Sequence, residues 1–325
     1  MSQRARPLPS SLTGPFRTTT ALDLGVSRGR LRAADLSAPF HGVRAPAPVT
    51  REVDDDAPLA IDEALRADIL ERVGAHRLVL PAHAFYIGST ARAIYRLPLE
   101  SPPTDLEVGV LAPHRGLRRP GIAATQVRPE LVTIRYVGGI PVASPASVWA
   151  LSARDATVRD LVVLGDAIVR IPRDERGRRM PWAQLASIDQ LAAALVAGRR
   201  LGADRLREAL ARIRVGSASP LETDFRLLIV HAGLPEPDLD AEVRRPDGRL
   251  LGISDAVYPD QRIAMEVEGD HHRTSRRQWN RDIQKYADYA AAGWDVVRVT
   301  AAHVRGPERD GVGLVRAALE RRSRG

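Results

Sequence analysis

The regular punctuation of residues 217–325 is the feature that most constrains the fold of this chain. Ser219-Pro220-Leu221-Glu222 is a capping box with proline at the first helical position, so it predicts a helix, which Gly233 ends. Three strands with turn signals between them are expected next, near 239–244, 249–257 and 261–268. A long helix from Ser275 to about Ala292, a strand and a last helix follow. The resulting order is α-β-β-β-α-β-α.

The chain has 325 residues, more than the roughly 250–300 at which a single hydrophobic core stops growing, so two or three domains are expected. The Pro-rich and acidic stretch 45–60 predicts a linker. We therefore expect a basic winged-helix-like module over 1–50, an α+β middle domain over 51–216 and the punctuated domain over 217–325. The fold class is mixed α+β and α/β. The elements expected in the middle domain are helices near 60–73, 89–95, 145–153, 157–169, 187–197 and 203–213, and strands near 105–111, 122–128, 131–137 and 140–144.

The N-terminal residues 16–32 predict a helix–turn–helix. A first helix runs through Leu24 and is closed by Gly25, and Ser27 caps a second helix that runs through Leu31. The second helix would carry three arginines that suit phosphate or base-edge contacts, namely Arg28, Arg30 and Arg32. The alternative is an ordinary exposed, arginine-rich helix.

Charge is distributed unevenly along the chain. The 48 Lys and Arg against 40 Asp and Glu give a net charge of +8. Residues 217–325 hold 17 basic and 18 acidic residues, so residues 1–216 hold 31 and 22, a net charge of +9. This excess predicts a polyanionic partner for the N-terminal part, and a general preference for arginine is the alternative. Only Lys285 is a lysine, and the other 47 basic residues are arginines.

Composition excludes several classes of protein. There is no cysteine, which excludes a disulfide scaffold, a cysteine-ligated zinc site and thiol catalysis. No apolar run reaches the roughly 18 residues that a membrane span needs, and the N-terminal residues lack the apolar core of a secretory signal. We therefore expect a cytoplasmic protein with no membrane contact.

Three carboxylates are expected to lie close together. In the strand 261–268, Glu266 and Glu268 point to the face opposite the apolar residues, and Asp255 lies on the preceding strand. Each close pair of carboxylates costs on the order of a few kcal/mol at a surface-like dielectric, so a cation is expected between them. Oxygen ligands with open positions suit Mg²⁺ or Mn²⁺, and a metal-bound water in line with a phosphodiester is a hydrolytic arrangement.

Cationic groups follow these carboxylates in the sequence. Gly269-Asp270-His271-His272 comes directly after the strand, and a histidine there suits metal binding, proton transfer or phosphate contact. In the helix 275–292, the spacing predicts one polar face and an opposite apolar stripe. The polar face contains Gln278, Arg281, Asp282 and Lys285, and the stripe contains Trp279, Ile283, Tyr286 and Ala290. The Lys285 ammonium would stabilise charge on an attacked phosphate or help to deprotonate water.

Residues 217–304 resemble the PD-(D/E)XK nuclease superfamily, and more closely its endonuclease domains similar to the very short patch repair endonuclease. The matching segments are SPLETDFRLLIVHAGLPEP, Asp255-Ala-Val-Tyr-Pro, Glu266-Val-Glu-Gly-Asp-His-His, Gln278-Trp-Asn-Arg-Asp and Gly293-Trp-Asp-Val-Val-Arg-Val. The whole chain also looks like actinobacterial proteins in which such a domain follows a region resembling the abortive-infection type IV antitoxin. That likeness depends on residues 16–32, on Gly42-Val43-Arg44 and on the segment 140–169.

The resemblance implies roles for individual residues. Asp255 and Glu266 take metal-ligand positions, and Glu268 takes the position of the superfamily's lysine, where the closer family often has an acidic residue. His272 matches a histidine of the closer family, and Glu222 matches the acidic residue of the first core helix. Lys285 is a candidate substitute for the missing lysine. Other interpretations are a capping role for Glu222, an exposed strand end for Glu268 and a surface loop for His272.

The function expected from the residues and the resemblance together is that of a Mg²⁺- or Mn²⁺-dependent DNA endonuclease that hydrolyses phosphodiester bonds. Asp255, Glu266 and Glu268 bind the metal ion, and Arg28, Arg30 and Arg281 contact DNA. One alternative is a non-enzymatic, antitoxin-type DNA-binding regulator with a degenerate nuclease-like domain. Another is a protein-interaction module in phage defence. The sequence is also compatible with a homodimer and with a protein partner from a toxin–antitoxin or defence system.

Overall fold

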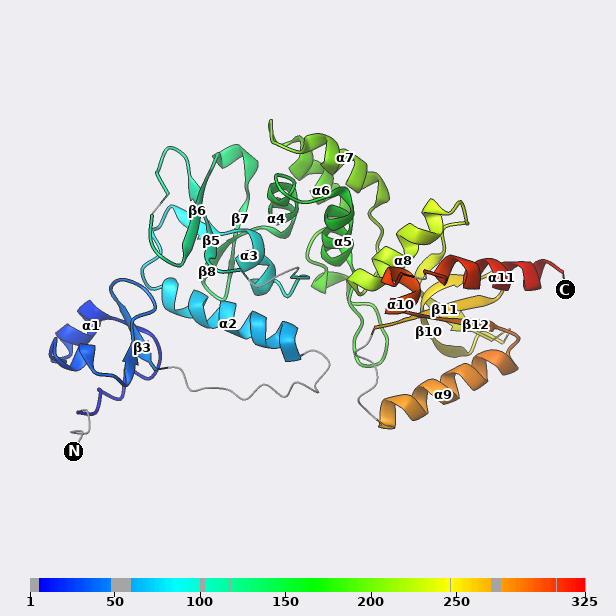
Figure 1. Cartoon of the computed structure of the whole chain (residues 1–325), viewed down its shortest axis with the longest axis horizontal. Coiled ribbons are helices and arrows are strands. Elements are labelled where there is room, and N and C mark those ends of the chain that lie inside the picture. Colours follow the sequence, from blue (N-terminus) through cyan, green and yellow to red (C-terminus); the bar gives the residue numbers. More distant parts are fainter. Residues whose placement is uncertain are drawn as a thin grey trace. The chain divides into compact units, whose positions relative to one another are not determined.

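The structure is a computed structural model that describes residues 6–47, 60–99, 103–116, 118–245, 247–269, 276–307 and 309–324. In these residues the chain divides into two compact units, and the division falls between Leu151 and Ser152. Both units combine helices with a β-sheet, so the predicted mixed class is confirmed (Figure 1). Across the described ranges, no helix combines the length and the apolar character that a bilayer crossing requires.

The first unit begins with a small module that only partly matches the predicted helix–turn–helix. Its elements are β1 (Phe16–Arg17), α1 (Thr18–Asp23), the 3-10 turn η1 (Arg30–Arg32), β2 (Leu36–Ser37) and β3 (Val43–Pro46), with sheet order β1-β3-β2. The predicted first helix is confirmed, and Gly25 closes it with a φ of 80°. The predicted second helix is wrong, since Gly29 weakens helix formation there and the Arg44 guanidinium occupies the Leu31 carbonyl at 2.8 Å.

The rest of the first unit is a five-stranded sheet covered by helices. Its strands are β4 (Ala84–Tyr86), β5 (Leu106–Leu111), β6 (Ile122–Val127), β7 (Ile134–Val137) and β8 (Ile140–Ala143), in the order β6-β5-β4-β8-β7. Its helices are α2 (Ala60–His76), α3 (Gly88–Ile94) and α4 (Pro145–Ser152). Phe85, Tyr86 and Leu106 are fully buried in its core. The sequence predicted all of these elements except β4, which is short.

The second unit contains the predicted α-β-β-β-α-β-α order. Three helices, α5 (Val158–Val169), α6 (Ile188–Val196) and α7 (Ala203–Arg212), precede it. The elements of that order are α8 (Pro220–His231), β9 (Asp238–Arg244), β10 (Leu250–Tyr258), β11 (Ile263–Glu268), α9 (Arg276–Ala291), β12 (Asp295–Thr300) and α11 (Gly311–Ser323). A short helix not predicted, α10 (Ala301–Arg305), lies before α11.

One four-stranded sheet organises this order. Its strands lie in the order β12-β11-β10-β9, with β11 and β12 parallel and the other pairs antiparallel. On one face, Met265 and Val267 of β11 belong to a core with Phe225 of α8. On the other face, Ala264 belongs to a cluster with Tyr289 of α9. Figure 1 shows α9 on the side of the sheet opposite α8. Each face of the sheet is therefore covered by helices.

Helices α5, α6 and α7 belong to the same compact unit as the four-stranded sheet, although they lie before residue 217. The unit therefore does not begin at the predicted boundary of 217. Asp166 of α5 and Arg226 of α8 form a buried ion pair of 2.8 Å, with side chains 1% and 2% exposed. The Thr223 hydroxyl and the Arg214 backbone N–H also donate to Asp166, at 2.9 and 2.8 Å. These buried bonds require α5 and α8 to stay together. Most of the predicted linker 45–60 lies outside the described residues.

Candidate active site

The candidate site begins where the pairing of β10 with β11 ends. The antiparallel register runs from Tyr258 opposite Ile263 to Ala256 opposite Met265. At its end, the Asp255 carboxylate accepts a hydrogen bond of 2.7 Å from the Val267 backbone N–H. The carboxylate thus takes the place of a strand carbonyl at the point where β10 and β11 separate. We call this point the fork and define it by Asp255 of β10 and Glu266 of β11.

Glu266 faces α9 from the neighbouring strand. Its side chain is only 11% exposed and accepts hydrogen bonds from the Ser254 hydroxyl at 2.7 Å and from the Lys285 ammonium at 2.8 Å. The same ammonium donates to the Ile253 carbonyl at 2.7 Å. Lys285 is therefore fixed at the fork by one strand carbonyl and one carboxylate, which offset the cost of desolvating its charge.

A glycine in β10 allows α9 to come this close. A Cβ atom on Gly252 would lie 2.6 Å from the Tyr289 hydroxyl and 3.2 Å from Lys285 Cε. The Ser254 hydroxyl lies 3.2 Å from the hydroxyl of Tyr289, which is fully buried. Ser254 and Tyr289 were not predicted, although a glycine inside a strand often signals a close approach of another element.

The orientation of α9 differs from the prediction. Tyr289, four residues after Lys285, is buried against the sheet, whereas Ile283 of the predicted apolar stripe is 48% exposed. The predicted apolar stripe is therefore wrong, because the sheet presents Ser254 and Glu266 to the helix, where Tyr289 contacts Ser254 and Lys285 pairs with Glu266.

Glu222 lies at the start of α8 and serves as its cap. Its carboxylate accepts hydrogen bonds from the Ala218 backbone N–H at 2.6 Å and the Ser219 hydroxyl at 2.9 Å, while its own N–H donates to Ser219 Oγ at 3.2 Å. The predicted Ser219 cap is confirmed, but the carboxylate accepts from the Ala218 N–H and not from the Ser219 N–H, so the reciprocal bond of a capping box is replaced by one to the preceding residue. The negative charge of Glu222 also acts on Asp255, so the carboxyl group contributes to the electrostatics of the fork.

Burial raises the pKa of the Asp255 carboxyl well above its usual range, and the charges of Glu222 and Glu266 raise it further. The hydrogen bond from Val267 and the charge of Lys285 oppose this rise. Burial also raises the pKa of Glu222. A cation placed between these carboxyl groups would favour their charged forms and would itself be stabilised by them.

Glu268 does not join these groups. The Arg298 guanidinium of β12 binds its carboxylate through two hydrogen bonds, at 2.6 and 2.9 Å. Within the residues that the structure describes, no three His, Asp or Glu side chains form a group arranged to hold a metal ion. The predicted set of three carboxylates is thus not assembled, since the parallel partner strand supplies Glu268 with a cation.

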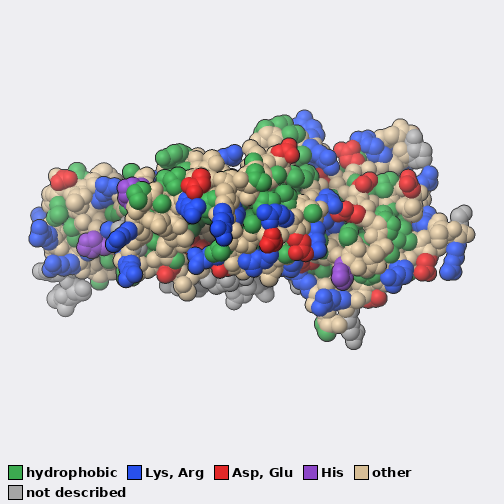
Figure 2. Space-filling view, turned by 90° about the horizontal axis from the view of Figure 1, so that it is seen from above, with side chains coloured by type: hydrophobic (Ala, Val, Ile, Leu, Met, Phe, Trp, Pro, Cys, Tyr) green, Lys and Arg blue, Asp and Glu red, His purple; other side chains and the backbone are tan. Residues whose placement is uncertain are grey.

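The remaining predicted residues are placed as follows. His272 and the Arg281 side chain lie outside the described residues. Arg28 is exposed, whereas Arg30 is held by Asp35 through hydrogen bonds of 2.9 and 2.7 Å and is only 11% exposed. The prediction that Arg30 faces DNA from a recognition helix is therefore wrong. Figure 2 shows Lys and Arg side chains scattered over the face in view, with Asp and Glu among them.

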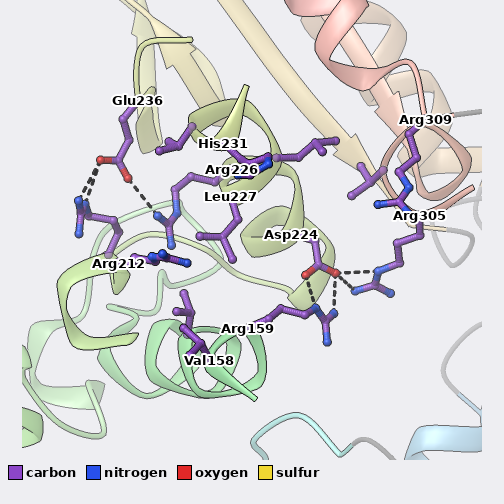
Figure 3. Close-up of a pocket in the computed structure, with 15 residues that line it drawn as sticks. Val158, Arg159, Arg212, Asp224, Arg226, Leu227, His231, Glu236, Arg305 and Arg309 are labelled. Carbon is purple, nitrogen blue, oxygen red and sulfur yellow. Dashed lines mark hydrogen bonds and ion pairs between the residues drawn. The ribbon is translucent and has the colours of Figure 1, made fainter. Parts of the chain in front are cut away.

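A separate cavity of about 690 Å³ lies in the second unit, among residues of α5, α7, α8 and α10 (Figure 3). Two shared carboxylates hold four of its six arginines: Asp224 pairs with Arg159 and Arg305, and Glu236 pairs with Arg214 and Arg226. None of the predicted site residues that the structure describes lines it. The cavity is therefore distinct from the fork.

No family model matches the chain. Two proteins of Mycobacterium tuberculosis, uncharacterized protein MT2308 of strain CDC 1551 / Oshkosh and uncharacterized protein Rv2248 of strain ATCC 25618 / H37Rv, are each 27% identical to it over 249 residues. The match covers 74% of this chain and 83% of theirs. The crystal structure of the RV2827C protein from Mycobacterium tuberculosis matches 74% of this chain and 91% of its own, at 16% identity and a TM-score of 0.36.

We expect Asp255→Asn to stabilise the metal-free protein. The folded chain holds the Asp255 proton more tightly than the unfolded chain, so the free energy of unfolding falls as pH rises from the ordinary Asp pKa of about 3.9 toward the raised value. Asparagine avoids this loss and still accepts from Val267. We therefore expect the variant to have a higher free energy of unfolding, and a higher Tm, than the wild type near pH 7.5.

Thermal unfolding in EDTA at several pH values between 5 and 8 measures this gain. The difference in Tm between the variant and the wild type should widen as pH rises. A variant that is less stable than the wild type at pH 7.5, or a difference that does not change with pH, would contradict the electrostatic account of the fork.

Proposed function

We propose that the second unit is a Mg²⁺-dependent DNA endonuclease whose active site is the fork. The observation that carries the proposal is the meeting of Asp255, Glu266 and the chain's only lysine at the end of the β10–β11 pairing. The raised pKa values of Asp255 and Glu222 support it, because clustered carboxyl groups with shifted pKa values are typical of functional sites.

The donor set at the fork fits a hard cation. Mg²⁺ keeps several waters and needs only one or two protein carboxylates, so Asp255 and Glu266 would suffice as its ligands, with Glu222 behind them. When bound, the ion would lower the pKa of a water and neutralise charge on the phosphodiester. Glu268 is not required in this scheme, because its carboxylate is already paired with Arg298.

Lys285 would supply the cation that position 268 lacks, because Glu268 stands where the superfamily has a lysine. Its ammonium is held by the Ile253 carbonyl and by Glu266, which leaves one of its three N–H bonds for another acceptor. A phosphate oxygen that gains charge during hydrolysis is such an acceptor, and a preorganised donor at that place lowers the barrier.

Cleavage of supercoiled plasmid tests the proposal. The wild type and the double variant Asp255→Asn/Glu266→Gln are incubated with plasmid in Mg²⁺, in Mn²⁺ and in EDTA. We expect nicking or linearisation by the wild type in metal only, and at least about 100-fold less by the variant. Equal cleavage by the two proteins, or none by either in any metal, would remove the enzymatic proposal.

Glu268→Gln serves as a matched carboxylate control on the same strand. Because Glu268 is paired with the 56%-exposed Arg298, we expect its loss to change stability by no more than about 1 kcal/mol. The rate of metal-dependent cleavage should stay within about threefold of the wild type, because Glu268 holds no metal in this scheme. A loss as large as that of the double variant would show that Glu268 acts at the site.

The alternative of an antitoxin-type regulator has weaker support. A helix–turn–helix protein reads DNA with its second helix, and η1 is a single turn at that position. Arg30, which would contact DNA from that helix, is occupied by Asp35. We therefore place the nucleic-acid contact of this protein in the second unit.

A further inference from the structure

The connection between α5 and α6 forms a small hairpin, which we call the basic arm and define as residues 172–183. The Asp174 N–H donates to the Arg178 carbonyl at 2.9 Å, and the Met180 N–H donates to the Pro172 carbonyl at 2.7 Å. The Asp174 carboxylate accepts from the backbone N–H groups of Arg176 and Arg178, both at 2.9 Å. These bonds close the loop on itself, so the arm has a defined shape.

The arm is attached to the strands that form the fork. Arg173 binds the Asp240 carboxylate of β9 through its Nε, at 2.7 and 2.9 Å from the two oxygens, and the two side chains are 12% and 20% exposed. A Cβ atom on Gly177, whose φ is 79°, would lie 2.9 Å from the Ile253 side chain. The turn of the arm thus lies on the residue whose carbonyl holds Lys285.

Asp240 also fixes the position of the arm relative to Asp255. The register pairs Ser254 with Ala241 and Ala256 with Leu239, so Asp240 and Asp255 occupy matching positions on β9 and β10. Arg173 neutralises a carboxylate that would otherwise add to the negative charge at the fork. The arm therefore contributes positive charge where a polyanionic substrate would meet several carboxylates.

The arm carries exposed side chains of the kinds that proteins use to bind unpaired nucleic acid. Trp182 is 81% exposed, more than any other large apolar side chain in the described part of the chain. Arg176 is exposed, and the Arg178 and Arg179 side chains are 72% and 49% exposed. Arg178 pairs with Asp174 at 2.7 Å and Arg179 with Asp240 at 3.4 Å, but both keep more exposed surface for a phosphate than Arg30, which is 11% exposed. An aromatic ring on which a base stacks, beside cations that meet the backbone, is the combination used by proteins that bind single strands.

We propose that the basic arm binds single-stranded DNA next to the fork, with Trp182 stacked on an unpaired base and Arg176 and Arg178 on backbone phosphates. This inference rests on the proposed nuclease function and names the form of its substrate. The arm connects α5 with α6 and is not part of the strands that carry the carboxylates, so the proposed substrate site extends beyond those strands.

Binding in the absence of metal tests the arm separately from cleavage. Fluorescence anisotropy with a labelled 20-nucleotide oligo(dT) in EDTA compares the full-length wild type with Trp182→Ala and with Arg176→Ala/Arg178→Ala. We expect Trp182→Ala to weaken binding about 10-fold. The double variant should lower the slope of log K against log salt by about 1.4, or about 0.7 for each lost phosphate contact.

Matched controls remove similar groups elsewhere in the same unit. Leu201→Ala removes an apolar side chain that is 72% exposed, and Arg207→Ala/Arg324→Ala removes two charges that are 64% and 81% exposed. Both controls should bind like the wild type, and all variants should keep the wild-type Tm.

The outcomes separate the two proposals. Arm-dependent binding without any metal-dependent cleavage would support the arm and overturn the nuclease. Metal-dependent cleavage with oligo(dT) binding that is unchanged in both arm variants would support the nuclease and overturn the arm. A 20-base-pair duplex that binds as tightly as oligo(dT) and loses as much affinity in Trp182→Ala would overturn the single-strand assignment.

Discussion

Replacement of Arg226 by methionine should cause the largest loss of stability of any single substitution considered for this protein. Arg226 is 2% exposed and pairs with Asp166, which is 1% exposed, and with Glu236 (Figure 3). Without the guanidinium, the Asp166 charge is left buried and unpaired, and its pKa is already raised by burial. We expect a loss of about 3–5 kcal/mol, or about 10 °C in Tm.

Two variants identify the cause of this loss. Asp166→Asn in the Arg226→Met background removes the unpaired charge and should recover part of the stability. Arg207→Met breaks an exposed pair, with side chains 64% and 99% exposed, and should change stability by no more than about 1 kcal/mol. A Tm for Arg226→Met within about 1 °C of the wild type would show that α5 and α8 are held together by other contacts.

The predicted elements of the second unit were accurate because their signals are local. A capping box, a Pro-Asp-Gly turn and period-two alternation act over a few residues, and α8, β9, β10 and β11 begin and end close to the predicted positions. The boundary at 217 depended on long-range contacts. Nothing near Asp166 in the sequence shows that it is buried against Arg226, so the division of the chain required the structure.

The candidate site shows the same contrast between local and distant interactions. The predicted strand contains both Glu266 and Glu268, as β11 does. Asp255 was expected on the preceding strand, and its carboxylate bonds to Val267 of β11. The parallel pairing of β11 with β12 decides which carboxylate stays near the fork, because it places Arg298 opposite Glu266, from where its guanidinium binds Glu268. Likewise, the sequence showed Lys285 to be unusual, while only the packing of α9 showed that it meets Glu266.

The basic arm was not predicted at all. Residues 172–183 were assigned no element, since the sequence there reads as a polar loop between two helices. Its significance depends on Arg173 reaching Asp240 and on Gly177 reaching Ile253, both far away in the chain. A signal was present in the sequence, because Trp182 follows Arg179 by three residues in a loop, and binding residues are often placed on loops.

Replacement of Lys285 by methionine should have the largest effect on activity. The ammonium lies 2.8 Å from Glu266 and 2.7 Å from the Ile253 carbonyl, and methionine keeps most of the side-chain volume without the charge. Removing one preorganised donor from a transition state typically costs about 100- to 1,000-fold in rate, so we expect metal-dependent cleavage to fall by at least about 100-fold. Oligo(dT) binding in EDTA should stay within about threefold, since the proposed binding groups lie on the basic arm.

The chain's single lysine permits an independent chemical test of the same role. Acetylation with an amine-selective reagent neutralises Lys285 and the N-terminal amine, whereas reductive methylation of the wild type keeps both charges; acetylated Lys285→Arg, which has only the N-terminal amine to modify, separates the two. If the ammonium stabilises charge on the phosphate, acetylated protein should lose cleavage as Lys285→Met does, and methylated protein should retain much more of it. Lys285→Gln provides the folding control, because an amide can still donate to Glu266. Cleavage by folded Lys285→Met or Lys285→Gln within about threefold of the wild type would show that the ammonium serves only to hold Glu266 in place.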